Sequence, residues 1–255
     1  MNIPVLDVQN LSVSFSGLKA VNGFSVSVSE GEIIAVIGPN GAGKTTVFNL
    51  LTGVYRSETG HILLDGKSLI GRPIHETASC GMARTFQNIR LFRNLSVREN
   101  IKVAHCRNMH YSMLDCLLRS KRYRDDEGLA DSLTSRTLKE FGFSDDADTP
   151  AGELPYGKQR RLEIARAMSL GAKVLLLDEP AAGMNHTETA ELMELIAKIR
   201  RKYGVAILLI EHDMSLVMKI CERIIVLDYG SIIAEGTPSE ILTNKAVLAA
   251  YLGED

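Results

Sequence analysis

The chain has 255 residues, a formal net charge of −2, 45% hydrophobic residues and 24% charged residues, which is ordinary for a globular protein with a sizeable core. This charge gives no electrostatic argument for nucleic acid as a partner, and no apolar run approaches the roughly 18 residues that a membrane helix needs. The four cysteines form no C-x-x-C pair, and polar residues at 7 and 9 interrupt any signal peptide, so we expect reduced thiols in a cytoplasmic protein.

The N-terminal part of the sequence carries patterns typical of an antiparallel β layer. Apolar and polar residues alternate over 11–15 and over 24–28, which is the period of half-buried strands. The segment 60–66 predicts a further strand that ends in an Asp-Gly turn. Within this layer, Phe15 is either a core or edge aromatic residue or a face on which an adenine ring can stack.

The segment 38–46, G-P-N-G-A-G-K-T-T, matches the phosphate loop G-x-x-x-x-G-K-[ST] of nucleotide hydrolases. It follows an apolar run typical of a buried strand and precedes a helix start, which is the context that the motif requires and that a chance Gly-rich turn lacks. Glycines let the backbone wrap a phosphate, and successive N–H groups form an anion nest at the positive end of a helix. Lys44 can reach the β and γ phosphates, and the Thr45 hydroxyl can bind Mg²⁺. The residues predicted to bind ATP here are Gly38, Pro39, Asn40, Gly41, Ala42, Gly43, Lys44, Thr45 and Thr46.

The middle of the sequence predicts an inserted helical block. A short strand is predicted over 82–87, where Gln87 is either an ordinary loop amide or a contact of the metal or the attacking water. A capping box at 96–99 should begin a helix, and the sequence is mostly helical from there to about residue 170. The dense charged run 119–127 predicts a solvated face or loop. We therefore expect one domain over 1–255, with a core and antiparallel β layer from 1–90 and 171–255 and a helical subdomain from about 91–170.

Two unbroken apolar runs in the second half end in candidate catalytic residues. Such runs suit central parallel strands, whose carboxyl ends carry ligands in open α/β sheets. Because Asp178 and Glu179 are adjacent at a strand end, we expect their side chains on opposite sides, one holding Mg²⁺ and the other polarising an attacking water. His212 after the second run is either a satisfied structural histidine or a γ-phosphate contact that positions the water. Helices are also predicted over 160–168, 187–203 and 214–221, and a strand pair over 223–228 and 231–235.

Taken in order, the motifs resemble the ATP-binding subunits of ABC transporters. The resemblance covers nearly the whole chain and rests on the phosphate loop, Gln87, 154–159, Asp178-Glu179, 181–185 and His212. Within that family, the sequence most resembles the branched-chain amino-acid importer subunits. The stretches that carry this second resemblance are 83–87, 90–92, 156–166, 179–183 and 250–254.

This resemblance implies an α/β P-loop NTPase core with an antiparallel β subdomain and an inserted α-helical subdomain. It implies an ATPase in which two subunits close head to tail over two ATP molecules, each held between one phosphate loop and the other subunit's signature. The implied catalytic residues are Glu179, His212 and Lys44, with Phe15 and Gln87 as further ATP contacts. The implied Mg²⁺ contacts are Thr45, Gln87 and Asp178, and the signature residues are Leu154, Pro155, Tyr156, Gly157 and Lys158.

The resemblance also implies partners and a location. The helical block would meet two membrane permease subunits through the loop after Gln87, where Leu91 and Phe92 are candidate apolar surface. A second ATP-binding subunit, either a different chain or a second copy, and indirectly a substrate-binding protein complete the expected assembly. The expected place is peripheral, on the cytoplasmic face of the inner membrane. The alternatives are the same ATPase role for another amino-acid or small-solute cargo, and a soluble ABC ATPase acting on ribosomes or DNA.

The chain departs from the family pattern at the signature and in the loop after Glu179. Where the family commonly has L-S-G-G-Q, Pro155 and Tyr156 replace the second and third residues, and a proline offers the γ-phosphate neither a hydroxyl nor an N–H. The Gly157 N–H and the positive end of the following helix remain. Asn185 stands where the family usually has an aspartate, at a position that couples subunits. We therefore expect unequal ATP sites when the partner carries a standard signature.

Overall fold

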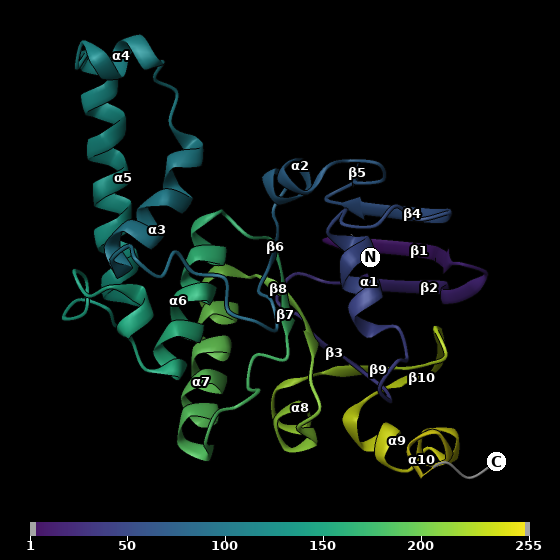
Figure 1. The fold of residues 1–255 in the computed structure, drawn as a ribbon. Helices are drawn as coiled ribbons and strands as arrows, with labels where there is room; N and C mark the ends of the chain where they lie inside the picture. Colours follow the sequence, from purple (N-terminus) through teal and green to yellow (C-terminus); the bar gives the residue numbers. More distant parts are fainter. Residues whose placement is uncertain (1–3, 253–255) are drawn as a thin grey trace. The chain divides into compact units, whose positions relative to one another are not determined.

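Residues 4–252 are described by a computed structural model, in which two sheets are joined by helices (Figure 1). The chain forms two units, Met1–Gln87 together with Ala172–Asp255, and Asn88–Gly171. Both sheets belong to the first unit, and the second unit is helical. The α/β fold expected from the sequence is confirmed.

The smaller sheet of the first unit is antiparallel throughout, as predicted. Its turn between the third and fourth strands uses Asp65 and Gly66, both with positive φ, because a two-residue hairpin needs left-handed backbone at these positions. In spatial order its strands are β2 (Leu18–Val28), β1 (Leu6–Phe15), β4 (Thr59–Leu64) and β5 (Lys67–Ser68).

The larger sheet carries the site. Five of its strands are parallel, and the sixth, β10, forms an antiparallel hairpin with β9. Every residue of β3, β7 and β8 is buried, which explains why these strands are unbroken apolar runs in the sequence. In spatial order the strands are β10 (Ser231–Gly236), β9 (Arg223–Asp228), β3 (Ile33–Ile37), β8 (Ala206–Ile210), β7 (Val174–Asp178) and β6 (Met82–Arg84). The strand predicted over 82–87 is thus too long, although the Thr85 N–H beyond its end still donates to the Leu176 carbonyl.

Helices of the first unit begin and end at specific capping residues. α7 begins after Asn185, whose side chain accepts the Glu188 N–H at 3.0 Å while the Glu188 carboxylate accepts the Asn185 N–H at 3.0 Å. It ends at Gly204 in the left-handed conformation. The helices are α1 (Lys44–Leu51), α2 (Ile74–Ser79), α7 (His186–Tyr203), α8 (Met214–Ile220), α9 (Pro238–Leu242) and α10 (Lys245–Leu252).

The second unit consists of helices α3 (Val97–His105), α4 (Met113–Leu117), α5 (Lys121–Glu140) and α6 (Tyr156–Ser169), with short 3₁₀ turns between them. The predicted capping box at the start of α3 is present. The helix predicted to begin at residue 160 begins at Tyr156 instead, because Pro155 has the fixed φ of a residue that can open a helix. Within residues 4–252, none of the helices combines the length and apolarity that crossing a bilayer requires.

Asn100 holds the loop before α3 in place. Its side chain is fully buried, and its Nδ2 donates to the carbonyls of Phe92 at 3.0 Å, Leu95 at 3.2 Å and Ser96 at 3.0 Å. Its Oδ1 accepts the Phe92 N–H at 3.0 Å. One amide therefore contacts four backbone groups of the loop: it accepts the Phe92 N–H and adds a donor to three carbonyls that also accept backbone N–H groups.

We predict that Asn100→Leu lowers the free energy of unfolding by about 3 kcal/mol, because it removes the hydrogen bonds of the side chain and leaves the Phe92 N–H without its acceptor. Asn100→Asp should also destabilise, since a carboxylate cannot donate to three carbonyls. Urea unfolding followed by circular dichroism measures both. Val103→Thr at a partly exposed position of the same helix is the control and should change the value by under about 0.5 kcal/mol. A loss for Asn100→Leu no larger than for the control would contradict this role.

Candidate active site

The phosphate loop joins β3 to α1, and two of its glycines cannot be replaced without moving the backbone. Gly38 has φ 150°, and a Cβ there would lie 2.0 Å from the Leu227 carbonyl oxygen. Gly43 has φ 99°, and a Cβ there would lie 2.5 Å from the Ala20 carbonyl oxygen. The close approach of β9 and β2 to the loop therefore explains why the sequence has glycine at both positions.

The Lys44 ammonium closes the loop on itself in this structure. Nζ donates to the carbonyl of Gly38 at 2.7 Å and to that of Pro39 at 2.8 Å, and the side chain is buried. Burial lowers the pKa of Lys44, while the negative charges of Glu179 and then Asp178 act to raise that pKa. A phosphate in the loop would supply the negative charge that this desolvated ammonium lacks.

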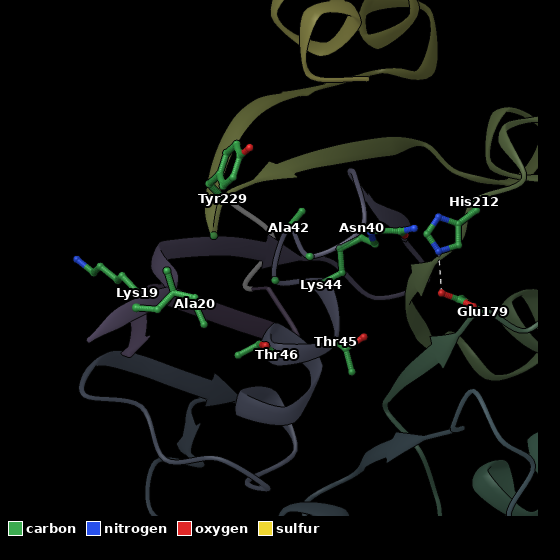
Figure 2. A pocket seen from close by; sticks show the side chains of 14 residues that line it. Lys19, Ala20, Asn40, Ala42, Lys44, Thr45, Thr46, Glu179, His212 and Tyr229 are labelled. Carbon is green, nitrogen blue, oxygen red and sulfur yellow. Dashed lines mark hydrogen bonds and ion pairs between the residues drawn. The ribbon is translucent and has the colours of Figure 1, made fainter. Parts of the chain in front are cut away.

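A pocket of 320 Å³ lies over the loop (Figure 2). Figure 2 shows His212 and Glu179 facing each other on one side of it, with Lys19 and Tyr229 on the other side. The pocket thus brings the phosphate loop together with two of the predicted catalytic residues. It is lined by Leu18, Lys19, Ala20, Asn40, Gly41, Ala42, Gly43, Lys44, Thr45, Thr46, Glu179, His212, Tyr229 and Gly230.

Glu179 is held by contacts of both its side chain and its backbone. Its Oε1 lies 2.7 Å from His212 Nε2, and its Oε2 accepts from Gln87 Nε2 at 2.9 Å. Its N–H donates to the Ile210 carbonyl at 2.9 Å, which fixes it to the end of β8. These contacts join three residues that the sequence analysis selected from separate segments.

The expectation that Asp178 and Glu179 are both on a strand is wrong for Glu179. The strand β7 ends at Asp178, and Glu179 has φ 45°, in the left-handed region. A non-glycine residue in that region costs about 1–2 kcal/mol, and such strain concentrates at functional sites. The turn after β7, rather than strand alternation, therefore aims Glu179 at His212 while Asp178 faces elsewhere.

Asp178 pairs with Arg84, a residue that the motif analysis did not select. Arg84 Nη2 lies 2.7 Å from Asp178 Oδ2, and Arg84 Nη1 donates to Asn49 Oδ1 at 2.6 Å. Both members of the ion pair are buried, and the guanidinium lies over the rings of Phe48 and Phe86. An arginine on a predicted buried strand requires a partner of opposite charge, and that requirement is the sequence signal that could have found the pair.

Glu211 is the second residue that the motif analysis missed. It is buried, and its Oε1 accepts the Ala181 N–H at 2.8 Å while its Oε2 accepts the His212 N–H at 3.0 Å. One carboxylate therefore joins the loop after Glu179 to the backbone of His212. Its place at the end of a buried strand, directly before His212, is the signal that the sequence offered.

Other predicted residues of this unit lie outside the pocket lining. Phe15 is half-exposed and packs edge-on against Tyr55, with ring centroids 5.1 Å apart. Pro39 lines a neighbouring cavity of 700 Å³ that it shares with Ala250 and other residues of α10. Tyr229, at the β9–β10 turn, is 89% exposed and lines both cavities, so it is an aromatic candidate beside the phosphate loop that the sequence marked only as a turn.

The signature residues lie at the start of α6 in the second unit. Leu154 is buried and its carbonyl accepts from Gln159 Nε2 at 2.7 Å, so it anchors the helix start. Pro155 and Tyr156 are exposed, whereas the Lys158 ammonium binds Asp146 Oδ2 at 2.7 Å. Gly157 lies in the first turn of α6, where N–H groups lack helical partners.

The predicted Mg²⁺ contacts fit that ion in donor chemistry, since all are hard oxygen donors. Thr45 lines the pocket, and Gln87 donates to the pocket residue Glu179. Asp178 does not line the pocket and is paired with Arg84. In the part of the chain that the structure describes, no group of three or more His, Cys, Asp or Glu residues could hold a metal by itself. A bound Mg²⁺ would therefore need phosphate oxygens and water as further ligands.

Comparison with known proteins gives matches over the full length. A family model described as ABC transporter matches residues 21–182, and one described as branched-chain amino acid ATP-binding cassette transporter matches residues 231–255. The high-affinity branched-chain amino acid transport ATP-binding protein BraF of Pseudomonas aeruginosa is 47% identical over 254 residues, covering all of both chains. The lipopolysaccharide export system ATP-binding protein LptB of Haemophilus influenzae is 34% identical, covering 98% of each chain. A crystal structure described as the ADP conformation of an ATP-binding cassette of an ABC transporter superposes with a TM-score of 0.84 at 29% identity, covering 98% of this chain and 99% of that chain.

We predict that Arg84→Met lowers the free energy of unfolding by about 3 kcal/mol, because the Asp178 carboxylate stays buried without its cation. Adding Asp178→Asn to Arg84→Met should recover about 1–2 kcal/mol, since the neutral amide removes the unpaired charge. Urea unfolding of the ligand-free protein measures the coupling.

The exposed pair Arg98–Asp148 is the matched control for this cycle, with side chains 42% and 90% exposed. Arg98→Met should cost under about 1 kcal/mol. Equal losses for Arg84→Met and Arg98→Met, or strict additivity of the two changes at 84 and 178, would contradict the assignment.

Proposed function

The chain belongs to the ATP-binding subunits of ABC transporters, the ATPases that energise transport, and from this premise we propose that it hydrolyses ATP to drive import of branched-chain amino acids. The observation that supports the catalytic part of the proposal is the pocket that unites the phosphate loop with the hydrogen-bonded pair Glu179 and His212. The observation that supports the cargo is full-length identity of 47% to a protein named for that transport.

ATP binding would replace contacts that the loop now makes with itself. The Lys44 ammonium, now bonded to two loop carbonyls, would turn to the β and γ phosphates. The N–H groups of 41–45 and the N-terminus of α1 would hold the same phosphates. Bound Mg²⁺, contacted by Thr45, Gln87 and Asp178, would neutralise phosphate charge. Phe15 remains the proposed adenine stack, with its ring half-exposed on the first unit.

Hydrolysis would depend on the group of Glu179, His212 and Gln87. Glu179 would accept a hydrogen bond from the attacking water and polarise it toward the γ-phosphate. His212 would turn from Glu179, which its Nε2 now contacts at 2.7 Å, to the γ-phosphate, and so release Glu179 for that water. Gln87 begins the loop that leads into the second unit, so its contact with Glu179 gives the partner-binding loop a route to sense the nucleotide.

The assembly that we propose contains a second ATP-binding subunit, either a different chain or a second copy, and two membrane permease subunits. Pro155, Tyr156 and Gly157 at the start of α6 would meet the partner's ATP. Phe92 would offer apolar surface to a permease, because it is 47% exposed and backed by the Arg166 guanidinium 4.9 Å from its ring. The complex would sit on the cytoplasmic face of the inner membrane and receive cargo indirectly from a substrate-binding protein.

Cargo is the part of the proposal that rests on relatives rather than on the site. The same fold serves a relative named for lipopolysaccharide export, so the nucleotide pocket does not select the solute. The higher identity to BraF and the match of residues 231–255 favour branched-chain amino acids over another amino acid or small solute. Residues 253 and 254, which carried part of the sequence resemblance, lie outside the described residues. ATP-dependent uptake of labelled leucine by the reconstituted complex tests the cargo, and uptake of other solutes without leucine would replace it.

We predict that Glu179→Gln keeps ATP binding but lowers kcat for hydrolysis by about 100-fold or more, because the amide cannot polarise the water as a carboxylate does. Binding of a fluorescent ATP analogue and phosphate release by the complex measure the two effects. Glu194→Gln, at an exposed position of α7, is the matched control and should leave both unchanged. Turnover of Glu179→Gln at the control's rate would remove the proposed role.

We predict that the two ATP sites are unequal in a complex with a different ATP-binding subunit that carries a standard signature. Lys44→Ala here and the equivalent lysine change in the partner should reduce ATPase activity and transport to different extents, because only one composite site contains Pro155. Steady-state ATPase and uptake of both single-subunit variants are compared. Identical losses in both measurements would show that the sites are equivalent.

A further inference from the structure

The short helix α4 exposes an apolar face that no other residue among 4–252 covers. None of its residues is buried. Met113 is 92% exposed, Leu114 69%, Leu117 79% and Leu118, directly after the helix, 76%. Positions spaced by one, four and five residues lie on one side of a helix, so the four side chains form a single apolar face.

This helix is formed without using that face for packing. A helix of one turn is not stable by itself, but Ser112 and Asp115 form a capping box: Ser112 Oγ accepts the Asp115 N–H at 3.2 Å, and Asp115 Oδ2 accepts the Ser112 N–H at 2.9 Å. The Ser120 hydroxyl donates to Asp115 Oδ1 at 2.8 Å. The Ser112 N–H and hydroxyl and the Ser120 hydroxyl hold the pKa of Asp115 at about 2. The one acid of α4 is thus occupied by the cap, and the apolar face stays available.

Basic side chains follow the apolar face directly. The segment 119–124 contributes four exposed cations and no acid, in a chain whose overall net charge is −2. They are Arg119, Lys121, Arg122 and Arg124.

Two of the three acids that come next are engaged within the unit. Asp126 accepts the His110 N–H at 2.8 Å, and Glu127 binds the Lys102 ammonium at 2.8 Å and the Tyr111 hydroxyl at 2.9 Å. Asp125 is exposed. Of these acids, Glu127 pairs with a cation whereas Asp125 and Asp126 keep their charge, so the excess of positive charge is confined to the segment 119–124 itself, directly after the leucines.

We propose that α4 and the segment 119–124 bind the surface of an anionic lipid bilayer, with the apolar face among the acyl-chain boundary and the cations at the lipid phosphates. Leucines flanked by several lysines and arginines suit the headgroup region, where apolar burial and charge attraction add. A protein partner would have to bring both an apolar surface and several carboxylates to this helix, whereas an anionic bilayer supplies acyl chains and phosphates together. The inference goes beyond the proposed function, since lipid binding requires neither nucleotide nor cargo.

Three leucines and a methionine make a weak anchor alone, as a single acyl chain does. The contact would therefore orient a chain that is already recruited by membrane subunits. In the free chain it should appear as reversible binding that depends on lipid charge and weakens with salt.

Flotation of the purified full chain with vesicles tests the proposal. We expect binding to phosphatidylcholine vesicles that contain phosphatidylglycerol and at least about fivefold weaker binding to pure phosphatidylcholine. Arg122→Gln with Arg124→Gln should weaken binding to the anionic vesicles by about fivefold for each charge removed. Leu114→Ser with Leu117→Ser should weaken binding to the anionic vesicles by about tenfold or more.

Leu242→Ser, at an exposed position of the first unit, is the control and should bind vesicles as the unchanged chain does. ATPase activity and thermal unfolding of all variants show that the folded state is kept. Equal binding to both vesicle types, or no effect of the α4 variants, would overturn the proposal. Loss of copurifying permease subunits from the Leu114→Ser, Leu117→Ser complex without any vesicle binding by the free chain would also overturn it, and would assign this face to a permease. The vesicle assay contains no transporter, so its outcome does not depend on whether the proposed transport function is correct.

Discussion

The parallel pairing of β8 with both β3 and β7 is the constraint on which the site depends. Parallel strands end at the same edge of a sheet, so the residues that follow β3, β7 and β8 must meet there. The phosphate loop follows the first of these strands, Glu179 the second and His212 the third. Burial of three apolar strands in one sheet is therefore enough to bring these three segments together.

At this edge, each carboxylate has its own donor. Asp178 receives a guanidinium, Glu179 receives an amide and an imidazole, and Glu211 receives backbone N–H groups. This distribution separates one acid that is tied to the core from one that faces the pocket. A buried carboxylate without such partners would be strongly disfavoured in its charged form, so the donors are what keep the acids available for metal and water.

Local chemistry explains what could be predicted from the sequence. The phosphate loop, the turn at Asp65-Gly66 and the capping box at Ser96 each depend on a few adjacent residues, and all three have the predicted form. The unbroken apolar runs indicated central strands because a two-sided burial leaves no polar positions. The family and its ATPase activity followed from the order of these motifs.

Tertiary contacts explain what could not be predicted. The pair of Arg84 with Asp178 joins residues 94 positions apart, and no local pattern marks an arginine that pairs in the core. The left-handed Glu179 is not glycine, so the sequence gives no sign of its backbone. The start of α6 at Tyr156 depends on Pro155, and a proline can either precede a helix or interrupt one.

The strand order of the larger sheet also determines when the site can form during translation. The phosphate loop is among the first segments to leave the ribosome, yet both strands that flank β3 belong to the last quarter of the sequence. The Leu227 carbonyl, which leaves no room for a Cβ at Gly38, belongs to β9 and is therefore synthesised long after the loop. During translation the phosphate loop is therefore exposed before its neighbouring strands exist. The complete nucleotide pocket forms only after β8 and β9 have emerged from the ribosome.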